Sequence, residues 1–266
     1  MIINIYFNWV NTSKGEKMIP HIIHYCWFGL SAKPDIVKKC IASWQKYMPD
    51  WEIREWNEAN YNVNKIPYTK EAYEQKKWAF VVDFARFDIL NLYGGIFLDT
   101  DVELLRRIPE EILELNSFTG YENGNKINPG LIYAAEPGQE MLLKIMMEYC
   151  EKKFNQNETI CDIVTKVLVS SGLRKDGSLQ LIENVKVFPA DYFCGFDHET
   201  QHFIITSNTV SIHHYAASWA PWYRKVRFKV IKIIAGIIGP ERYKRIKHKM
   251  LHDRRKKTID GCDKKA

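Results

Sequence analysis

Apolar positions in the first part of the chain switch repeatedly between the spacing of a helix and the short runs of a buried strand. Residues 18–28 form one apolar run that ends at a glycine and predict a strand, and residues 51–56 predict a second strand. Between them, apolar residues recur at every third or fourth position over residues 36–48, which predicts a helix. A strand, a helix and a strand in this order are typical of parallel strands joined by a crossover. The sequence therefore predicts an α/β fold with a mixed, mostly parallel sheet flanked by helices.

Further along the chain, the same two patterns recur with less regular spacing. Apolar residues at helical spacing predict helices over residues 139–153 and 158–171. An apolar stretch over residues 130–135 and shorter runs near Val185 and Ile204 predict further strands. These elements extend the α/β pattern well past the middle of the chain.

The most informative segment is a helix, a pair of glycines and a short strand that ends in carboxylates. Apolar residues recur at near-helical spacing over residues 78–93, and residues 96–98 form a brief buried run before Asp99 and Asp101. Because alternate residues of a strand share a face, we expect the two carboxylates to point the same way. They stand at the carboxyl end of the strand, where open α/β sheets bind ligands. Paired carboxylates suit Mn²⁺ or Mg²⁺, which take oxygen ligands from one or two carboxylates, water and phosphates.

Composition sets the broad class of the protein. Hydrophobic residues make up 46% of the 266 positions, which is ample for a globular core. Six cysteines show no CxxC pair or zinc spacing, and no secretory leader is evident, so we expect a reducing, cytoplasmic location. An apolar run near the N-terminus is interrupted by Asn4 and Asn8 and is too short to span a bilayer. We therefore expect an N-terminal extension over residues 1–17 and a main domain over residues 18–221.

Charge is distributed very unevenly along the chain. Residues 222–266 carry 16 Lys and Arg against 4 acidic residues, whereas residues 1–221 carry 22 against 28. One helical face near the start of this tail holds Val226, Val230, Ile233, Ile234 and Ile237, and another holds Lys225, Lys229 and Lys232. This predicts a basic amphipathic helical tail on an anionic membrane surface, peripheral at the inner face of the cell membrane. A packed terminal helix followed by a solvated basic tail is the alternative. No recognised nucleic-acid-binding motif accompanies the basic residues, so we expect no nucleic-acid partner.

The Asp-Thr-Asp triplet by itself is a weak signal, because acidic residues flank another residue by chance in many loops. Here it follows Asp83 and Arg86 within one helix, glycine and strand unit. An arginine beside carboxylates either forms a structural ion pair or holds the hydroxyls and phosphates of a ligand. The residues alone leave both interpretations open.

Three blocks of the sequence resemble a known family. Residues 79–103, with residues 19–29 and 211–219, resemble glycosyltransferase family 32, the DXD glycosyltransferases of yeast α-1,6-mannosyl transfer and of bacterial capsule and lipopolysaccharide synthesis. They also resemble the catalytic domain of the large glucosylating bacterial toxins. The resemblance covers roughly residues 18–220, with the blocks in the family's order. It implies a GT-A fold for residues 18–221, a nucleotide-sugar donor, Mn²⁺ or Mg²⁺, and transfer with retention of anomeric configuration.

The resemblance also implies roles for individual residues. Trp27 matches the aromatic residue that stacks on the donor's base, although a tryptophan at a strand end is also commonly a core residue. Asp83 and Arg86 match the pair that binds hydroxyls of the donor sugar. Asp99 matches the carboxylate that contacts ribose and sugar, and Asp101 matches the direct metal ligand.

The last block carries imidazole, hydroxyl and indole groups. A histidine late in many GT-A chains completes the metal shell, and strand alternation allows only one of His213 and His214 to point inward. We choose His214. Ser218 and Trp219 match positions that contact the metal or the leaving phosphate. Asn128 resembles the family's Asn-x-Gly turn near the donor sugar, with an ordinary loop as the alternative.

These features together predict a metal-dependent retaining glycosyltransferase. We expect transfer of a hexose from a nucleotide sugar, UDP-hexose rather than GDP-mannose, to a saccharide or lipid-linked saccharide in capsule, O-antigen or lipopolysaccharide synthesis. One alternative is a metal-dependent phosphohydrolase, but such enzymes usually gather more ligands around two metals than Asp99 and Asp101 provide. The other alternative is a non-catalytic, membrane-associated protein that binds sugar nucleotides. The presence of Asp83, Arg86 and both later aspartates argues against a decayed site.

Overall fold

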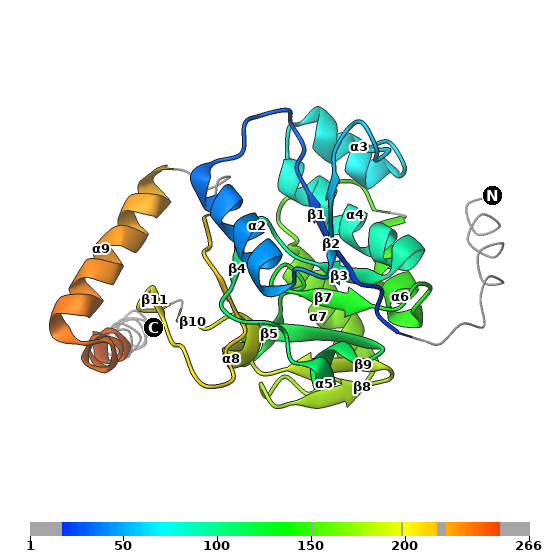
Figure 1. Cartoon of the computed structure of the whole chain (residues 1–266). Helices are drawn as coiled ribbons and strands as arrows, with labels where there is room; N and C mark the ends of the chain where they lie inside the picture. The colour runs from blue at the N-terminus through cyan, green and yellow to red at the C-terminus, as the bar shows by residue number, and fades with distance from the viewer. Residues whose placement is uncertain (1–17, 151, 198, 217–221, 251–266) are drawn as a thin grey trace, which may run out of the picture. The chain divides into compact units, whose positions relative to one another are not determined.

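The computed structural model describes residues 18–150, 152–197, 199–216 and 222–250 (Figure 1). The chain forms two compact units. Of the described residues, the first unit contains those up to residue 195 and residues 205–215, and the second contains those from 196 to 204 and from 216 onward. The predicted boundaries after residues 17 and 221 stay predictions, because both follow segments outside the described residues.

The first unit is built on one mixed sheet. Its strands are β1 (Ile22–Cys26), β2 (Glu52–Trp56), β3 (Gly95–Phe97), β5 (Ser117–Asn123), β6 (Lys126–Ile127), β7 (Tyr133–Ala135), β8 (Gln180–Ile182) and β9 (Val185–Phe188). Among the described residues, these eight strands follow the order β2-β1-β3-β7-β5-β9-β8, with β6 paired to β5. Strands β2, β1, β3, β5 and β9 run in one direction, and β7, β8 and β6 run against them. The predicted α/β class with a mixed, mostly parallel sheet is confirmed.

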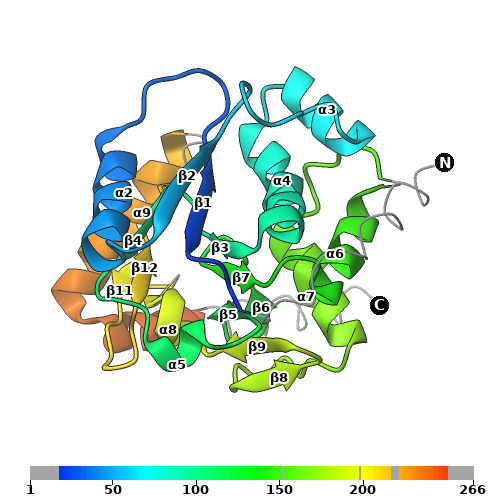
Figure 2. The same cartoon turned by 45° about the vertical axis from the view of Figure 1, so that its right-hand side comes forward.

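Helices cover both faces of this sheet. They are α2 (Asp35–Tyr47), α3 (Pro67–Glu74), α4 (Trp78–Tyr93), α5 (Glu110–Leu113), α6 (Glu140–Cys150), α7 (Ile160–Ser170) and α8 (Ala190–Phe193). Figure 2 shows α2 and α4 on opposite sides of β1, with α6 and α7 on the side of α4. The helices predicted over residues 36–48, 78–93, 139–153 and 158–171 correspond to α2, α4, α6 and α7.

Helix α4 leads directly into the segment that carries the carboxylates. Its residues are apolar on nearly every side, and Phe84, Phe87 and Leu90 are fully buried, as expected for a helix inside the molecule. The helix ends at Tyr93, and β3 begins two residues later. Gly94 and Gly95 both have positive φ, at 62° and 100°, which glycine adopts without strain. The predicted glycine break is therefore confirmed, and it fixes where the following turn lies.

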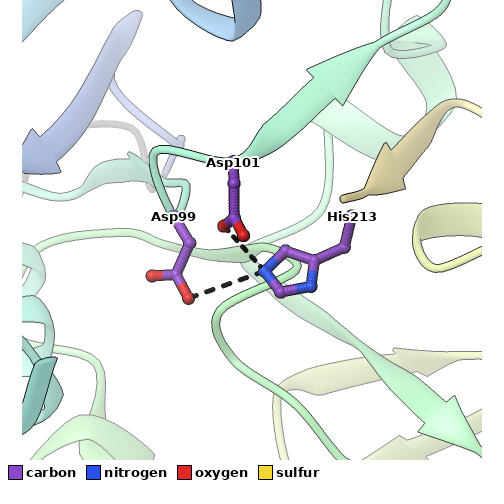
Figure 3. Close-up of side chains that lie close together, drawn as sticks. All are labelled: Asp99, Asp101 and His213. Carbon is purple, nitrogen blue, oxygen red and sulfur yellow. Dashed lines mark ion pairs between the residues drawn. The ribbon is translucent and has the colours of Figure 1, made fainter. Parts of the chain in front are cut away.

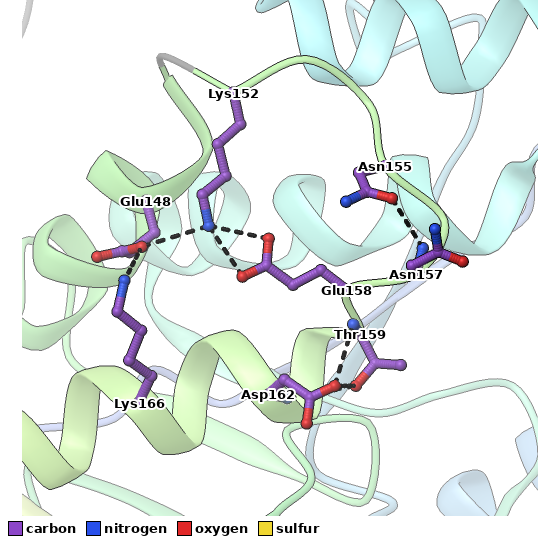
Figure 4. Close-up of polar contacts among 8 residues, drawn as sticks. All are labelled: Glu148, Lys152, Asn155, Asn157, Glu158, Thr159, Asp162 and Lys166. Atoms are coloured by element: carbon purple, nitrogen blue, oxygen red, sulfur yellow. Dashed lines mark hydrogen bonds and ion pairs between the residues drawn. The ribbon is translucent and has the colours of Figure 1, made fainter.

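Polar contacts define the start of α7 and its link to α6 (Figure 4). The side chain of Thr159 accepts a hydrogen bond from the Asp162 backbone N–H, and the Asp162 carboxylate accepts one from Thr159, forming a capping box. Lys166 of α7 pairs with Glu148 of α6 at 2.9 Å. These contacts join the two helices that lie on the same side of the sheet as α4.

A second, smaller pairing completes the first unit. Strand β4 (Val102–Leu104) pairs antiparallel with β12 (Ser211–His213). Helix α2 is tied to β4 because the buried Trp44 donates its indole N–H to the Val102 carbonyl at 2.8 Å. Residues from the end of the unit are thereby brought beside the turn that follows β3.

The second unit contains two short strands and a helical region. Strands β10 (Phe196–Asp197) and β11 (His202–Phe203) pair antiparallel, and β11 corresponds to the strand expected near Ile204. Helix α9 (Trp222–Ile238) follows, and a further helical segment covers residues 240–250. None of the helices in the described part of the chain has the length and apolar character needed to cross a membrane.

One buried histidine of β1 forms hydrogen bonds with β2 and with the glycine that follows α4. His24 of β1 is fully buried, and its Nδ1 accepts a hydrogen bond from the indole of Trp56 at 3.1 Å. Its Nε2 lies 2.9 Å from the Gly94 carbonyl, so this nitrogen carries the proton and donates it. Burial lowers the pKa of His24 to about 4. The imidazole is neutral in the folded protein.

This depressed pKa predicts acid sensitivity. As the pH falls from about 6.5 to about 4, His24 becomes protonated in the unfolded state but stays neutral in the folded state. Protonation therefore stabilises the unfolded state, and the free energy of unfolding falls over this pH range. Between about pH 7 and pH 4, we expect the wild type to lose about 3 kcal/mol more free energy of unfolding than His24→Gln. Urea denaturation at each pH measures this. His21→Gln, which replaces an exposed histidine, should show the same dependence of the free energy of unfolding on pH as the wild type. The same pH dependence in all three proteins would contradict the depressed pKa of His24.

Candidate functional site

Two carboxylates lie on the turn between β3 and β4. Strand β3 ends at Phe97, and the Val102 N–H donates to the Asp99 carbonyl at 3.0 Å, which closes the turn. Asp99 and Asp101 therefore follow the carboxyl end of the strand as predicted, but the expectation that they alternate within a strand is wrong. Turn geometry, rather than strand periodicity, brings their side chains together.

His213 completes a three-residue cluster with these carboxylates (Figure 3). Its Nε2 lies 2.9 Å from Asp101 Oδ1 and 4.0 Å from Asp99 Oδ2. One ligand atom from each residue lies within 4.8 Å of the other two. His213 is the last residue of β12, whose pairing with β4 places it beside the turn. Two carboxylates and an imidazole form a donor set that suits Mn²⁺ or Mg²⁺.

His214 does not take the position that the sequence analysis gave it. Its Nε2 lies 2.7 Å from Glu103 Oε2, and the same carboxylate oxygen lies 2.8 Å from Lys39. Only one histidine of the pair faces the aspartates, as strand alternation requires, but that histidine is His213. The geometry therefore corrects the choice of His214.

Arg86 joins the cluster from helix α4. Its side chain is 2% exposed, and its Nη2 donates to Asp99 Oδ1 at 2.5 Å. Its Nε and Nη1 atoms are buried and have no hydrogen-bond partner among the described residues. The guanidinium carbon lies 4.9 Å from the centre of the Phe97 ring. The arginine is thus fixed in place while two of its donor nitrogens lack a partner among the described residues.

Asp83 lies one turn before Arg86 on the same helix. Its side chain is buried, and burial raises the pKa of its carboxyl to about 7, although Arg86 opposes this shift. Near neutral pH, this group can therefore act as a hydrogen-bond donor or as an acceptor. Arg86 forms its ion pair with Asp99, and the ligand-binding role of Asp83 and Arg86 stays a prediction.

Burial and mutual repulsion also perturb the cluster itself. Burial raises the pKa of Asp99, with a further contribution from Asp101, while Arg86 and His213 oppose the shift. Burial alone would lower the pKa of His213, but the carboxylates of Asp101 and Asp99 outweigh it and raise that pKa. The cluster thus concentrates negative charge around one imidazole, which is the electrostatic setting in which a cation binds.

A glycine makes room for Asp99. A Cβ atom on Gly130 would lie 2.2 Å from Asp99 Oδ2, so only glycine allows this close approach. The Asp99 N–H donates to the Gly130 carbonyl at 3.0 Å. Asn128 Oδ1 in turn accepts from the Gly130 N–H at 2.8 Å. Asn128 therefore holds the loop that lies against Asp99, and its place beside the donor sugar stays a prediction.

Sequence reasoning missed two polar residues next to the cluster. The Tyr215 ring stands edge-on to His213, with centroids 4.1 Å apart. The Tyr215 hydroxyl donates to Glu122 Oε1 at 3.0 Å, and Asn128 Nδ2 donates to the same oxygen at 3.0 Å. Glu122 thus joins the histidine side of the site to the Asn128 loop. Tyr215 could have been suspected because it follows the histidine pair directly, whereas Glu122 lies on β5, a strand that the sequence did not predict.

The remaining predicted residues are less informative. Trp27 follows β1, is partly exposed, and donates its indole N–H to the Ser31 carbonyl at 2.7 Å. Its predicted stacking on a base is untested. Ser218 and Trp219 lie outside the described residues.

Comparisons with solved structures give only distant similarity. The glycosyltransferase "PaToxG" has a TM-score of 0.43 and 15% sequence identity, covering 64% of this chain and 76% of its own. A glycosyltransferase involved in the glycosylation of the major capsid of PBCV-1 has a TM-score of 0.44 and 11% identity, covering 79% of this chain and 100% of its own.

Sequence comparisons are more specific. An "uncharacterized glycosyltransferase L373" of Acanthamoeba polyphaga mimivirus is 32% identical over 123 residues, covering 40% of this chain and 49% of that protein. The match thus spans about half the length of this curated relative. The profile of the capsular polysaccharide synthesis protein family matches residues 3–193, which is most of the chain. The chain belongs to the family of capsular polysaccharide synthesis proteins.

Proposed function

We propose that this protein is a metal-dependent glycosyltransferase that moves a hexose from a nucleotide sugar to a saccharide acceptor during synthesis of a surface polysaccharide. The observation that carries the proposal is the convergence of Asp99, Asp101 and His213 beside the buried Arg86. Membership of the capsular polysaccharide synthesis family supports saccharide chemistry. The resemblance to glycosyltransferase family 32 supports a GT-A arrangement of the first unit.

Asp101 and His213 are the proposed metal ligands, with Asp99 close enough to contribute. Their ligand atoms are mutually near, and the donor set of oxygen and imidazole nitrogen fits a hard divalent cation. Bound there, Mn²⁺ or Mg²⁺ would supply the positive charge that a departing nucleoside diphosphate needs. Arg86 pairs with the Asp99 carboxylate, and Gly130 leaves room for it.

Donor binding is assigned to the α4 side of the site. The Arg86 guanidinium, whose buried Nε and Nη1 lack partners among the described residues, is proposed to donate to hydroxyl or phosphate oxygens of the donor. Asp83, with its pKa near neutrality, can donate to a sugar hydroxyl or accept from one. Trp27 is proposed to stack on the base, and Asn128 to border the sugar. Ser218 and Trp219 are proposed contacts of the leaving phosphate.

Retention is proposed from the family resemblance. The acceptor hydroxyl attacks the anomeric carbon on the face from which the diphosphate leaves. As the new carbon–oxygen bond forms and the bond to phosphate breaks, the hydroxyl proton passes to the departing phosphate oxygen. We propose a UDP-hexose donor, rather than GDP-mannose, and a lipid-linked saccharide acceptor in capsule, O-antigen or lipopolysaccharide synthesis.

Replacing one carboxylate tests the proposal directly. Asp101→Asn keeps the size of the side chain but removes its charge, so we expect release of nucleoside diphosphate to fall at least about 100-fold with the fold intact. The assay follows turnover of UDP-hexoses and GDP-mannose with and without Mn²⁺, and circular dichroism checks the fold. Asp35→Asn, at an exposed carboxylate of α2, should leave the rate unchanged. Full activity of Asp101→Asn would remove the metal role.

The neighbouring histidines form a matched pair of variants. His213→Gln removes the imidazole beside Asp101, so we expect Mn²⁺ affinity to fall about 10- to 100-fold. His214→Gln alters the contact with Glu103 at 2.7 Å rather than the one with Asp101, and we expect its Mn²⁺ affinity to stay within about threefold of the wild type. Isothermal titration calorimetry or electron paramagnetic resonance of Mn²⁺ measures both. A larger loss in His214→Gln would reverse the assignment.

A true donor should also stabilise the folded protein. Ligand at about 100 times its dissociation constant adds about 2.7 kcal/mol of stability, which corresponds to a rise in Tm of roughly 5–10 °C for a protein of this size. We expect the rise for a uridine sugar nucleotide and only in the presence of Mn²⁺. Thermal-shift screening of uridine and guanosine sugar nucleotides measures it, and a larger shift with GDP-mannose would contradict the UDP assignment.

A further inference from the structure

Helix α9 carries a strip of exposed aliphatic side chains. The strip consists of Val226, Val230, Ile233, Ile234 and Ile237, which are 49%, 47%, 61%, 43% and 79% exposed. At about 100° per residue these five positions fall within one face of the helix. Exposed aliphatic residues scattered singly are common on proteins, but a continuous strip on one helix face is unusual.

The strip is not the side through which α9 packs. Ala235 is fully buried, and Ile231 and Ile238 are partly buried. By helical geometry these three positions lie roughly 100–160° around the helix from the centre of the strip. An ordinary surface helix has one apolar packed side and a polar exposed side. Helix α9 therefore has a second apolar side that the packing of the described residues does not account for.

Basic residues border the strip. Arg227 and Lys229 lie on its two sides, each roughly 80° from its centre. Neither makes an ion pair with another residue in the described part of the chain. In the helical segment that follows, Lys244 pairs with Asp197 at 2.7 Å, whereas Arg242, Arg245 and Lys249 have no such partner among the residues that the structure describes. Much of the positive charge of this segment is thus available to an external partner.

We propose that this strip binds an anionic phospholipid surface, with α9 lying in the plane of the interface. An apolar face flanked by lysine and arginine is the arrangement by which interfacial helices bury aliphatic side chains among lipid chains while their cations contact headgroup phosphates. The helix lies on the membrane and does not cross it, consistent with its length and hydropathy. The inference goes beyond the proposed function, because it depends only on the second unit.

Charge argues for lipid over a second copy of the chain. Residues 222–250 hold ten Lys and Arg and one acidic residue, Glu241. A symmetric dimer through the strip would bring two such helices together and concentrate like charges at the contact. An anionic membrane instead offers both an apolar interior for the strip and negative charge for its border.

The test uses the full chain and a variant that keeps every charge. In the strip variant, Val230, Ile233 and Ile237 are each replaced by Asn. Sedimentation with vesicles of phosphatidylcholine, alone or with about one third phosphatidylglycerol, measures binding. We expect the wild type to bind the anionic vesicles at least about tenfold more tightly than the neutral ones, and the strip variant to lose at least about tenfold on the anionic vesicles. Rising NaCl concentration should weaken wild-type binding.

A matched control carries three equally conservative changes elsewhere. Val169, Leu179 and Leu181 are exposed aliphatic residues of the first unit, at 41%, 48% and 66%, and their triple replacement by Asn should leave vesicle binding within about twofold. If the circular dichroism spectrum shows that the strip variant is unfolded, the double variant Arg227→Gln with Lys229→Gln provides a second test. We expect it to bind anionic vesicles more weakly than the wild type, and unchanged binding would contradict the inference.

Three outcomes would overturn the inference. In the first, the wild type does not bind anionic vesicles. In the second, the strip variant binds them as tightly as the wild type. In the third, the wild type is a dimer and the strip variant is a monomer, but the two bind vesicles equally well. Turnover with a soluble acceptor should be the same in the strip variant and in the wild type. A failure of the membrane inference is thereby distinguished from a failure of the proposed glycosyl transfer.

Discussion

The ion pair between Arg86 and Asp99 ties helix α4 to the turn that carries both carboxylates. On its other side, Asp99 fits against Gly130, where a Cβ atom would lie 2.2 Å from its Oδ2. Three segments that are separate in the sequence thus meet at one carboxylate: a buried helix, the turn after β3, and the loop before β7. The position of Asp101 relative to His213 depends on this anchoring, because a turn that moved would carry both aspartates with it.

The buried charged groups around Asp99 lower the stability of the folded protein when no ligand is considered. Burial and the neighbouring Asp101 raise the pKa of Asp99, and burial raises that of Asp83. In addition, two nitrogens of the buried Arg86 lack hydrogen-bond partners among the described residues. Unpaired buried donors cost about 1–3 kcal/mol each, and more when charged. Groups of this kind are found together where a protein binds a polar ligand, because the ligand satisfies what the fold leaves unpaired.

Periodicity predicted the regular parts of the fold well. Helix α2 and the strands β1 and β2 on either side of it follow from amphipathic spacing, and Gly94 and Gly95 correctly marked the boundary between α4 and β3. Strand β5 was missed because it lies inside the sheet between β7 and β9, and its residues 117–121 are all buried. It lacks the apolar run expected of a buried strand, because the buried Ser117 and Thr119 are polar and donate to the carbonyls of Ala134 and Ile132, and Gly120 in its middle weakens the signal further.

The candidate site was predictable as a list of residues but not as a geometry. Alternation along a strand states that one of two consecutive histidines faces a given side, and cannot state which one. That choice is made by the register of β12 against β4, in which His213 lies opposite Val102, the residue next to Asp101. The pairing joins segments more than a hundred residues apart, and nothing local in either segment encodes it. The same limit applies to Glu122, which contacts Tyr215 on the histidine side of the site. Local chemistry therefore identified the carboxylates, while long-range strand pairing determined which imidazole joins them.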